Sequence, residues 1–445
     1  MKPVSAWGCL SRELHNVTVL SNPLSVSSVL TSHAPGLAYG NGRSYGDVCL
    51  NPGGVLWETS GLNKLISFDE KTGRLVCEAG VLLRDIQRLF MPRGWMLPVT
   101  PGTQLITVGG AIANDVHGKN HHAVGSFGNH VLSLLLARTT GEMQEVNWSS
   151  APELISATIG GLGLTGVIVK AELQMRRVGS PWMRTETIPY QGLTQFFALA
   201  DESEQDWEHT VSWIDCLAGT NVRGIFIRAN HMDAREADNM PSLREALASY
   251  NHKIQGKTLS MPFVPPASFV NNFSLKPFNL AYYLLQKRKR GMGVTHFEPF
   301  SYPLDNVQHW NRMYGPKGFY QYQCVVPRES GHDAIQAMLN VIAQAGEGSF
   351  LAVLKTFGRH EANGMLSFTK SGVTLALDFP NRGLRTLQLF ERLDDIVSQS
   401  KGRLYMAKDA RMSRELFQAG YPNWLEFIKY RDPGISSAMS RRLME

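Results

Sequence analysis

A glycine-dense run near the start of the chain has the composition of a phosphate-binding loop. The run is Gly40-Asn41-Gly42-Arg43-Ser44-Tyr45-Gly46-Asp47. Glycine has no Cβ, so backbone N–H groups at such positions can surround a diphosphate. The spacing differs from the G-x-G-x-x-G fingerprint of Rossmann units, and turn-forming residues follow it instead of a helix. Taken alone, the run indicates either an anion-binding loop outside the Rossmann class or a plain glycine turn.

Further glycine loops follow before Lys170. Pro101-Gly102-Thr103 leads to Thr107-Val108-Gly109-Gly110, and later come Gly125-Ser126-Phe127-Gly128 and the run 160–166. Each is a candidate to present backbone N–H groups to a ligand. A large cofactor that contains a diphosphate needs several such loops at once, so their number favours a cofactor of this kind.

Four histidines lie close together in the same part of the chain. His117, His121, His122 and His130 could suggest a metal site. However, no cysteine is near them, Asp115 is the only local carboxylate, and their spacing does not match a two-histidine zinc pair on one helix. We therefore expect no metal here.

Several polar residues in strand-like runs are candidates for a substrate surface. Gln321 and Gln323 are two apart, so in a strand both amides point to one side, where sugar hydroxyls could satisfy them. An exposed strand face is the alternative. Thr374 and Ala376 also share one face, and Lys355 lies in a further strand-like run. Trp213 could cover a sugar ring, although a core position is equally natural for it.

The composition is that of an ordinary globular protein. Hydrophobic residues make up 43% and charged residues 18% of 445 residues, a length that favours two or three domains. The net charge of +6 is too small to indicate nucleic-acid binding by itself. Five scattered cysteines without a C-x-x-C pair, and the lack of an apolar run of about 18 residues, predict a soluble, cytoplasmic protein.

The elements that position these residues are expected to mix strands and helices irregularly. Short strands are predicted at 55–57, 64–68 and 74–77, a helix at 82–90 and a buried strand at the end of 157–170. Longer alternating runs at 224–229, 318–326, 350–357 and 373–379 predict a large sheet, with helices at 333–345 and 383–399. This pattern predicts an α+β fold rather than a doubly wound sheet.

With these loops in this order, the sequence resembles the FAD-dependent flavoenzymes of the vanillyl-alcohol oxidase type, which have a PCMH-type FAD-binding domain. Within them it is most similar to the decaprenylphosphoryl-ribose oxidase subgroup. The resemblance spans about residues 39–443. The motifs that carry it are Gly42-Arg43-Ser44-Tyr45-Gly46-Asp47, Thr107-Val108-Gly109-Gly110-Ala111-Ile112-Ala113, His117-Gly118-Lys119-Asn120-His121-His122, Gly125-Ser126-Phe127-Gly128-Asn129-His130, Trp310-Asn311-Arg312, Tyr314-Gly315-Pro316, Gln321-Tyr322-Gln323, Gly402-Arg403-Leu404-Tyr405 and Ala407-Lys408-Asp409.

The resemblance implies a two-domain flavoenzyme. Residues 1–180 are expected to form the FAD-binding domain, 181–402 a substrate-binding domain with a large antiparallel sheet, and 403–445 a return to the FAD-binding domain. The cofactor contacts that it implies are Gly40, Asn41, Gly42, Arg43, Ser44, Tyr45, Gly46, Asp47, Gly102, Thr107, Val108, Gly109, Gly110, His117, Gly118, Lys119, Asn120, Ile168 and Tyr405. Relatives that bind FAD covalently through the first loop have a histidine before the serine. Because Arg43 stands there, noncovalent FAD is expected.

The expected reaction is transfer of a hydride from a carbinol carbon to the flavin, with loss of the hydroxyl proton. Lys408 is the candidate to contact the substrate hydroxyl or the flavin edge, Tyr45 is a second candidate proton relay, and His117 is expected beside the flavin ring. An isolated lysine before an aspartate would otherwise be read as a solvated ion pair. The substrate contacts expected are Lys119, Trp213, Gln321, Gln323, Lys355, Thr374, Ala376 and Lys408.

Two positions depart from the pattern of the subgroup. The actinobacterial enzymes carry a cysteine where this chain has Ala376 and a tyrosine where it has Ser301. Both positions are expected at the substrate pocket, so the sugar or its lipid carrier can differ here.

The stretch 259–285 is apolar and aromatic but interrupted by prolines, and it is followed by Lys287-Arg288-Lys289-Arg290. It is expected to be a long, mobile surface segment. Its apolar strip could hold a polyprenyl chain while the cations meet phosphates or an anionic membrane, which would make the protein peripheral to the inner membrane. A solvated basic loop end is the alternative.

The activity that the resemblance implies is FAD-dependent oxidation of a secondary hydroxyl of a polyprenylphosphoryl pentose (ribose) to a keto sugar. An NAD(P)H-dependent short-chain reductase would be the pathway partner, and the net epimerisation would supply an arabinose donor for a cell-envelope glycan. Two alternatives stay open: a sugar alcohol or aldonolactone oxidase that acts on a soluble substrate, and a scaffold that binds a partner enzyme or lipid. No nucleic-acid partner is expected.

Overall fold

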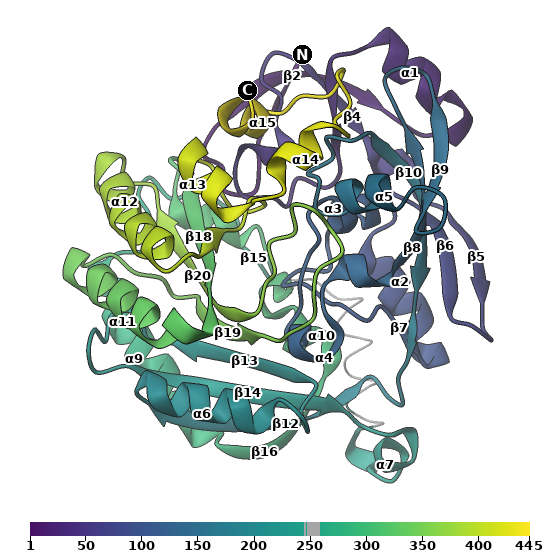
Figure 1. Ribbon diagram of the computed structural model, residues 1–445. Coiled ribbons are helices and arrows are strands. Elements are labelled where there is room, and N and C mark those ends of the chain that lie inside the picture. The colour runs from purple at the N-terminus through teal and green to yellow at the C-terminus, as the bar shows by residue number, and fades with distance from the viewer. Residues whose placement is uncertain (244–245, 247–258) are drawn as a thin grey trace.

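The computed structural model describes residues 1–243, 246 and 259–445 of the chain. Helices and mainly antiparallel sheets are mixed in it, which confirms the predicted α+β class. Figure 1 shows two smaller sheets in the upper and right-hand part of the molecule and a large sheet with its helices at the lower left. Both chain ends lie at the top of this view.

The N-terminal residues form a small sheet that ends at the first glycine loop. Strands β2 (Glu13–Val19) and β3 (Gly36–Tyr39) run parallel to β4 (Val55–Glu58), and β1 (Lys2–Val4) pairs with β2 in the antiparallel sense. Helix α1 (Val26–Ser32) connects β2 and β3 and contributes to the same hydrophobic core. Because β3 ends at Tyr39, the loop that starts at Gly40 leaves the sheet at the end of this strand.

A five-stranded antiparallel sheet follows, in the order β5-β6-β10-β8-β9. Its strands are β5 (Leu65–Asp69), β6 (Arg74–Glu78), β8 (Val131–Ala137), β9 (Met143–Asn147) and β10 (Val167–Gln174). The first three residues of β10 are buried and β-branched, as suits a pleated core strand. Three helices share the core of this sheet: α2 (Leu83–Phe90), α3 (Val108–Ala113) and α5 (Pro152–Thr158).

The large sheet has eight antiparallel strands in the order β16-β12-β14-β13-β19-β20-β18-β21. The strands are β12 (Trp182–Gln191), β13 (His209–Ile214), β14 (Arg223–His231), β16 (Gly291–His296), β18 (Phe319–Val326), β19 (Ala352–Phe357), β20 (Gly372–Pro380) and β21 (Arg403–Leu404). All four strands predicted from alternating runs are therefore confirmed.

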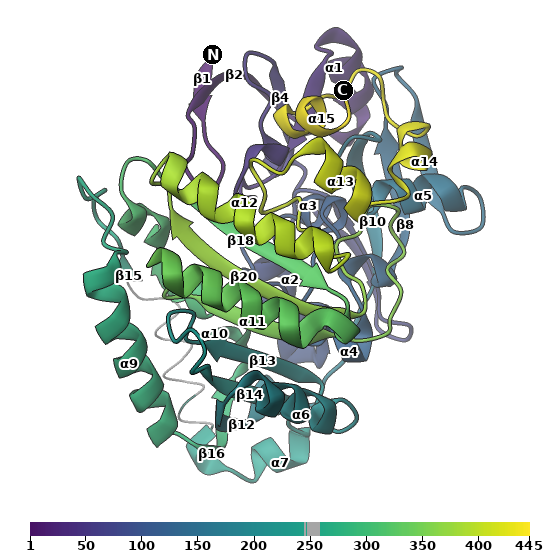
Figure 2. The same ribbon diagram turned by 60° about the vertical axis from the view of Figure 1, so that its left-hand side comes forward.

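Three helices cover one face of the large sheet. They are α6 (Leu193–Ser203), α11 (Arg328–Ala345) and α12 (Leu384–Gln399), and Figure 2 shows α11 and α12 side by side in front of β18 and β20. Helix α11 starts directly after Pro327 and ends at Gly346, whose φ of 62° is the left-handed conformation that stops helices. Both helices that the sequence predicted at 333–345 and 383–399 are thus present.

Alternation along β18 and β20 separates an apolar face from a polar one. Tyr322, Cys324 and Leu375 belong to the core beneath the helices. The residues between them point the other way, toward the FAD-binding part of the chain that the sequence predicts. The polar face of the sheet is therefore free to line a site.

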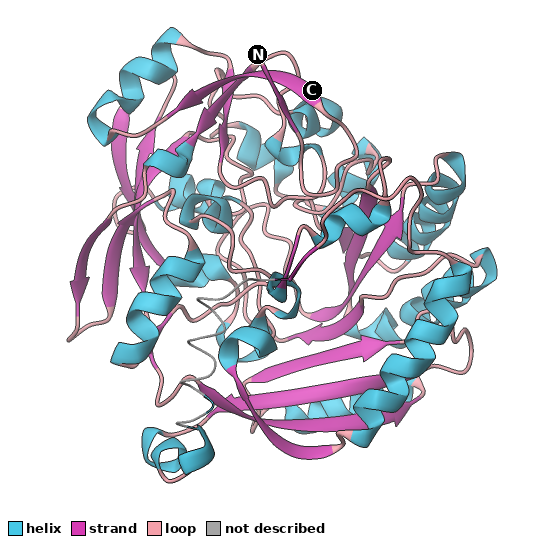
Figure 3. Ribbon diagram, turned by 180° about the vertical axis from the view of Figure 1, so that it is seen from behind, coloured by secondary structure: helices cyan, strands magenta, loops and turns pink. Residues whose placement is uncertain are grey.

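The segment predicted to be mobile instead forms a helix for much of its length. Helix α9 (Asn272–Arg288) starts with a capping box in which the Asn271 side chain accepts from Phe273 and Ser274 amides. Pro277 lies inside the helix, in its second turn, where it removes one N–H from the helical ladder. Seen from behind, α9 lies across the strands of the large sheet (Figure 3). The prediction over 259–285 was wrong because capping and tertiary packing outweigh the prolines.

The C-terminal residues return to the N-terminal sheet. They form α13 (Arg414–Gly420), α14 (Trp424–Ile428) and α15 (Ala438–Leu443). The amide of Gly36 donates to Gly434 O at 2.9 Å, and the amide of Ser436 donates to Gly36 O at 3.1 Å. Short elements complete the described chain: α4 (His121–Val124), α7 (Ala234–Asp238), α10 (Phe297–Ser301), β7 (Trp95–Met96) paired with β11 (Arg176–Arg177), and β15 (Leu259–Ser260) paired with β17 (Val307–Gln308).

Candidate active site

One large cavity lies between the glycine loops and the polar face of the large sheet. Its walls come from the loop after β3, from α3 and the start of β10, and from strands β13, β18, β19 and β20 with the segment 405–408. The volume of the cavity is about 350 Å³, which lies within the roughly 300–1,000 Å³ of pockets that hold drug-sized ligands. The cavity therefore has room for a ligand larger than a single sugar.

Most of the residues proposed from the sequence line this cavity. On the side of the glycine loops these are Gly40, Asn41, Gly42, Arg43, Ser44, Tyr45, Gly102, Thr107, Gly109, Gly110, His117, Gly118, Lys119, Ile168 and Tyr405. On the side of the large sheet they are Gln321, Gln323, Lys355, Thr374, Ala376 and Lys408. Residues that are far apart in the sequence thus meet around a single space.

Five proposed contacts lie outside the lining: Gly46, Asp47, Val108, Asn120 and Trp213. Val108 is fully buried in the core of the five-stranded sheet. Gly46 packs so closely against the backbone of Asp409 that a side chain would not fit. Both residues therefore support the packing of the loops beside the cavity.

The other three residues outside the lining also have identifiable structural partners. Asp47 accepts from Arg442 at 2.9 Å and so holds the C-terminal helix. Asn120 donates to Pro98 O at 2.9 Å. Trp213 donates to Phe350 O at 3.0 Å and packs against Tyr282 of α9. Its ring therefore lies between the large sheet and this helix.

The loop after β3 has the free donors expected of an anion-binding site. Within the described chain, the amides of Asn41, Gly42, Arg43 and Ser44 donate to no protein acceptor. The loop is held from outside, because Trp7 N donates to Ser44 O at 2.8 Å. Gly42 has a φ of +59°, and a Cβ there would collide with the Tyr39 hydroxyl. The loop is therefore a rigid row of open N–H groups, which suits the diphosphate of FAD.

The loop before α3 was also expected to present free backbone N–H groups to a ligand, but its N–H groups already have acceptors in the protein. The amides of Val108 and Gly109 already donate to Val81 O and Ala79 O, and that of Gly110 donates to the Thr107 hydroxyl. These three N–H groups are therefore not available to a ligand. The glycines of this loop can still let a ligand come close to the backbone. The local sequence could not reveal this, since the acceptors come from another part of the chain.

Two glycines in the lining mark where a ligand can approach the backbone. A Cβ built on Gly102 or on Gly163 would have no atom within 4 Å. Both residues line the cavity, so a side chain at either place would project into open space. Such a cradle fits a cofactor that lies flat against the chain.

Arg43 stands where a flavin-linking histidine would be. Its guanidinium lies 4.1 Å above the ring of Trp7, a cation–π contact that fixes the side chain beside the cavity. An arginine side chain retains its charge and has no nucleophilic nitrogen to form a flavin bond at neutral pH. The Arg43 side chain therefore offers no nucleophile for a flavin bond at this position, and the residues of the loop fit bound FAD.

The polar face of the large sheet forms a patch of hydrogen-bonding groups. In the register of β18 against β20, Gln323 is opposite Ala376 and Gln321 is opposite Asp378. Gln321 donates to the Asp378 carboxylate at 2.6 Å. Asp378 was missed by the sequence analysis, although it follows Thr374 and Ala376 at the two-residue period of a strand and also lines the cavity.

His117 lies between two polar neighbours in the cavity wall. The Gln323 amide nitrogen is 2.9 Å from its Nε2, and the Lys355 Nζ atom is 3.3 Å from its Nδ1. Burial, followed by the positive charge of Lys355, holds the pKa of His117 well below its usual value. His117 is therefore a neutral imidazole at physiological pH. Burial also lowers the pKa of Lys355 to about 8.

Lys408 is placed directly against Tyr45. Its Nζ atom lies 3.8 Å from the centre of the Tyr45 ring, and the Tyr45 amide donates to Ala407 O at 3.0 Å. Burial lowers the pKa of Lys408 to about 7, against the opposing effect of Asp378, and Lys355 lowers it further. Burial raises the pKa of Tyr45 well above its usual value, so its hydroxyl stays protonated. A lysine of this kind can take up or release a proton near neutral pH.

Lys119 lines the cavity and also binds the backbone of α10. Its ammonium donates to the carbonyls of Phe300 and Ser301, the latter at 2.9 Å. Burial, with a smaller effect from Lys355, lowers the pKa of Lys119 to about 7. Lys119 therefore connects the glycine loops with α10 beside the cavity.

The other histidines of the cluster point to separate partners. His121 packs on Phe357 with ring centres 4.6 Å apart, while His122 lies 2.7 Å from Trp207 O and His130 lies 2.9 Å from Val124 O. In the part of the chain that the structure describes, no group of three or more metal-ligating side chains comes together.

Comparisons with known proteins agree with this site. Residues 26–147 match the family described as "FAD binding domain". The chain is 34% identical to decaprenylphosphoryl-beta-D-ribose oxidase of Mycolicibacterium smegmatis, over 99% of this chain and 97% of that protein. It is 30% identical to an uncharacterized protein of Streptomyces coelicolor, over 82% of this chain and all of that protein. L-gulonolactone oxidase of Mus musculus is 28% identical over 30% of each chain.

Proposed function

We propose a function from one premise: the chain belongs to the family of FAD-binding oxidoreductases that includes decaprenylphosphoryl-beta-D-ribose oxidase. The proposed reaction is oxidation of a secondary hydroxyl of a polyprenylphosphoryl pentose, ribose in the first instance, to a keto sugar. One observation carries the proposal: open loop amides and a patch of polar side chains that can bind sugar hydroxyls line the same cavity. The proposal also includes the domain boundaries: residues 1–180 and 403–445 form the FAD-binding domain, and residues 181–402 form the substrate-binding domain.

Noncovalent FAD would be held by the loop from Asn41 to Ser44 and by the glycine-lined wall at Gly102 and Gly163. When bound, FAD supplies the acceptor for the hydride that leaves the carbinol carbon. In the proposal, the neutral amine of Lys408 takes the hydroxyl proton, and Tyr45 holds the Lys408 side chain in place. Gln321 and Gln323 orient the sugar ring through hydrogen bonds.

The pathway context is also part of the proposal. Reduction of the keto sugar by an NAD(P)H-dependent short-chain reductase would invert the carbon and yield an arabinose donor for cell-envelope glycan. Ala376 and Ser301 both line the cavity. Because the smaller side chains leave more room than cysteine and tyrosine, the pentose or its carrier can differ from that of the actinobacterial enzymes.

A soluble sugar alcohol or aldonolactone is the second candidate substrate. The similarity to L-gulonolactone oxidase favours it, but this covers 30% of each chain. An exposed apolar surface elsewhere on the molecule favours a lipid-linked substrate instead.

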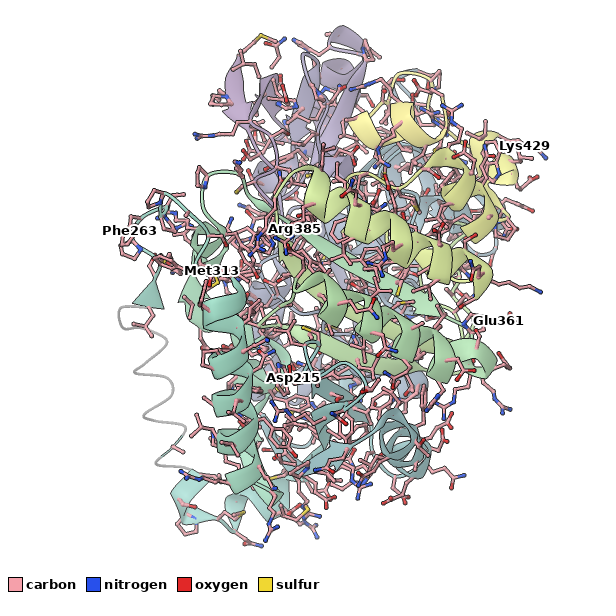
Figure 4. The ribbon with its side chains drawn as sticks, turned by 90° about the vertical axis from the view of Figure 1, so that its left-hand side faces the viewer. Asp215, Phe263, Met313, Glu361, Arg385 and Lys429 are labelled. Carbon is pink, nitrogen blue, oxygen red and sulfur yellow. The ribbon has the colours of Figure 1, made fainter. Side chains whose placement is uncertain are left out.

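That surface is the outer side of α9 and the segment before it. Phe273 is 93% exposed, and Phe278, Leu280, Leu284 and Leu285 are also exposed on the helix. Figure 4 shows Phe263 at the outer edge of the molecule, near the upper end of α9, and Asp215 behind the helix.

The inner side of α9 is fixed to the large sheet. Asn279 is buried and donates to Asp215 at 2.9 Å, and Leu275 and Tyr283 are buried one turn on either side. The helix is thus anchored by one narrow face and presents its broad apolar face outward. Apolar side chains that gather on one exposed face mark a surface for interaction.

We infer that this face binds an anionic lipid surface. The last turn of α9 and the residues after it carry Lys287, Arg288, Lys289 and Arg290, all exposed. Basic residues beside an apolar helix face are typical of peripheral membrane helices, and each cation contributes about 1 kcal/mol near anionic lipids. Among the described residues, no helix has the length and apolar character needed to cross a bilayer.

The substrate assignment is tested by the visible spectrum of the purified protein under anaerobic conditions. Addition of a polyprenylphosphoryl ribose is expected to bleach the flavin band, whereas free ribose and an aldonolactone leave it unchanged. Bleaching by the aldonolactone alone would replace the proposed substrate with the soluble class. Absence of flavin from the purified protein would overturn the enzymatic function.

The lipid contact is tested by sedimentation with phosphatidylcholine vesicles that contain or lack phosphatidylglycerol. The parent is expected to bind the anionic vesicles, and the double variant Leu280→Ser/Leu284→Ser to bind them at least tenfold more weakly. Leu24→Ser/Leu425→Ser is the matched control, because both leucines are exposed on other elements. Equal binding by all three proteins would exclude α9 as the contact.

A further inference from the structure

An arginine on the last helix binds two carboxylates from distant parts of the chain. The Nε atom of Arg442 on α15 donates to Asp47 Oδ2 at 3.0 Å, and its Nη2 atom donates to Asp47 Oδ1 at 2.9 Å. The same Nη2 atom donates to Asp409 Oδ2 at 2.9 Å. The Nη1 atom donates to the carbonyl of Met412. All three nitrogens are thus engaged, and the planar guanidinium fixes its acceptors relative to one another.

The two carboxylates depend on this cation. The side chain of Asp409 is 4% exposed and that of Asp47 is 20% exposed, and within the described chain neither forms an ion pair with another lysine or arginine. Burial raises the pKa of Asp47, Arg442 opposes that rise, and the charge of Asp409 adds to it. Without Arg442, two like charges would face each other with little water around them, so the segments that carry them would move apart.

Asp409 fixes the turn that carries Lys408. Its Oδ1 atom accepts from the amides of Arg411 at 3.1 Å and Met412 at 2.9 Å. On the other side of the turn, the amides of Lys408 and Asp409 donate to Tyr405 O at 2.9 Å and 3.1 Å. The Asp409 carboxylate therefore holds the backbone from which the Lys408 side chain extends to the cavity.

Asp47 lies at the end of the loop that carries Tyr45. The loop and the lysine turn meet directly, because the Tyr45 amide donates to Ala407 O at 3.0 Å and the Lys408 Nζ atom lies 3.8 Å from the centre of the Tyr45 ring. Arg442 binds the residue after Lys408 and the residue two positions after Tyr45. A change in the distance between the two carboxylates would therefore alter the contact between Lys408 and Tyr45.

We infer that Arg442 is a positioning residue: by holding Asp47 and Asp409 together, it keeps Lys408 against Tyr45 in the cavity wall. This inference deepens the proposed function and rests on it for the role of Lys408 as the base. Arg442 and both carboxylates are not among the residues that line the cavity, so they act through the segments that they hold. The C-terminal helix thus contributes to the site without contacting a ligand.

The first test measures single-turnover flavin reduction by saturating polyprenylphosphoryl ribose in FAD-loaded proteins. Arg442→Gln is expected to slow reduction by roughly tenfold or more, because a small displacement of the base disturbs its alignment with the substrate hydroxyl. The FAD content and the substrate concentration at half-saturation are expected to stay as in the parent. A residue with a structural role alone would lower the FAD content or the stability and leave the rate of the loaded protein unchanged.

Arg441→Gln is the matched control. Arg441 precedes Arg442 on α15, and its Nη1 atom donates to Asn51 Oδ1 and to the Ser436 hydroxyl, both at 2.9 Å. It binds the same helix to the N-terminal residues without reaching Asp409, so the control is expected to keep the parental rate. Arg442→Lys keeps the charge without the planar fork, and its rate is expected to fall between those of the parent and the glutamine variant. It supplies the comparison if Arg442→Gln does not fold.

A double variant shows whether Arg442 acts through Lys408. In the Lys408→Ala background, Arg442→Gln is expected to cause no further loss of rate, because the group that it positions is already absent. A further loss as large as that in the parent background would contradict the inference.

The second test does not depend on turnover. Acetylation by sulfosuccinimidyl acetate at alkaline pH, followed by mass spectrometry, measures how readily each lysine is reached. Release of Lys408 from Tyr45 is expected to raise its acetylation rate about threefold or more in Arg442→Gln but not in Arg441→Gln. Lys355 on β19 lines the same cavity and is the internal reference, with equal rates expected in all three proteins.

The two tests separate this inference from the proposed substrate. If polyprenylphosphoryl ribose does not bleach the parent, the substrate assignment fails, and acetylation still decides the role of Arg442. Faster acetylation of Lys408 alone would then support the inference. Unchanged acetylation of Lys408, or an equal rise at Lys355, would show that Arg442 does not position Lys408.

Discussion

The side-chain amide of Gln323 and the imidazole of His117 meet at 2.9 Å across the cavity wall, although 206 residues separate them in sequence. On its other side the imidazole faces Lys355 at 3.3 Å. A neutral imidazole has one donor and one acceptor nitrogen, so one of the two neighbours must present an acceptor. Either the amide turns its oxygen toward His117 or Lys355 is an uncharged amine. Loss of a proton from Lys355 can therefore change the tautomer of His117.

Replacement of Gln323 by leucine should weaken substrate binding more than the chemical step. The change leaves His117 without its partner and removes an amide from the substrate face of the cavity. A lost hydrogen bond is worth about 1 kcal/mol, so the KM for the sugar should rise roughly fivefold while kcat changes little. Steady-state kinetics check this, with Gln399→Leu on the exposed end of α12 as control. An unchanged KM would remove Gln323 from the sugar site.

Replacement of Lys408 by alanine should leave FAD bound but slow its reduction. General-base catalysis contributes roughly 10²–10⁴-fold, which is the expected loss in single-turnover bleaching. In the parent, the neutral amine is the active form, so the rate should rise with pH through about 7. Lys64→Ala, at an exposed position, serves as control. Bleaching as fast as in the parent would show that Lys408 is not the base.

Side chains added at Gly102 should exclude the cofactor without preventing folding. The space around a Cβ at this position is empty within 4 Å and belongs to the cavity. The FAD content of the purified protein should therefore fall in the order glycine, alanine, valine, while the far-UV circular dichroism stays the same. Equal flavin content in all three proteins would place FAD elsewhere.

Acid precipitation should release all of the flavin into the supernatant. Arg43 stands at the position where a histidine would form a covalent bond, and its guanidinium is held over Trp7. The measurement is flavin absorbance in the supernatant and in the washed pellet. A yellow pellet would contradict noncovalent binding.

Asp115 should be important for stability because its side chain binds residues from two other segments of the chain. Its buried carboxylate accepts from Ser126 at 2.8 Å, from the Gly128 amide at 2.7 Å and from Ser367 at 2.5 Å. Alanine would leave these donors without a partner and lower the free energy of unfolding by about 3 kcal/mol. Asparagine keeps an acceptor and tolerates the φ of 38°, so Asp115→Asn should lose much less. Denaturant titration checks both variants; equal losses would contradict the hydrogen-bonding role.

The sequence by itself determined the local elements and the chemical character of the site. The strand β20 and the helix α12 follow from apolar spacing, because side-chain periodicity decides which face can be buried. The open loop from Asn41 to Ser44 was predictable from its glycines. Gln321 and Gln323 were placed on one face by the two-residue period of a strand, and both line the cavity.

Only the tertiary structure decided which of these groups remain free and which are already satisfied. Val108 and Asn120 lie in motifs that point to a cofactor, yet the first is core and the second is bonded to Pro98. The helix α9 forms despite Pro277, because its anchor on Asp215 comes from a distant strand end. Asp378 and Lys408 line the same cavity only because the C-terminal part of the chain returns to the glycine loops. Burial and long-range partners set pKa values and hydrogen bonding, and neither is encoded in local spacing.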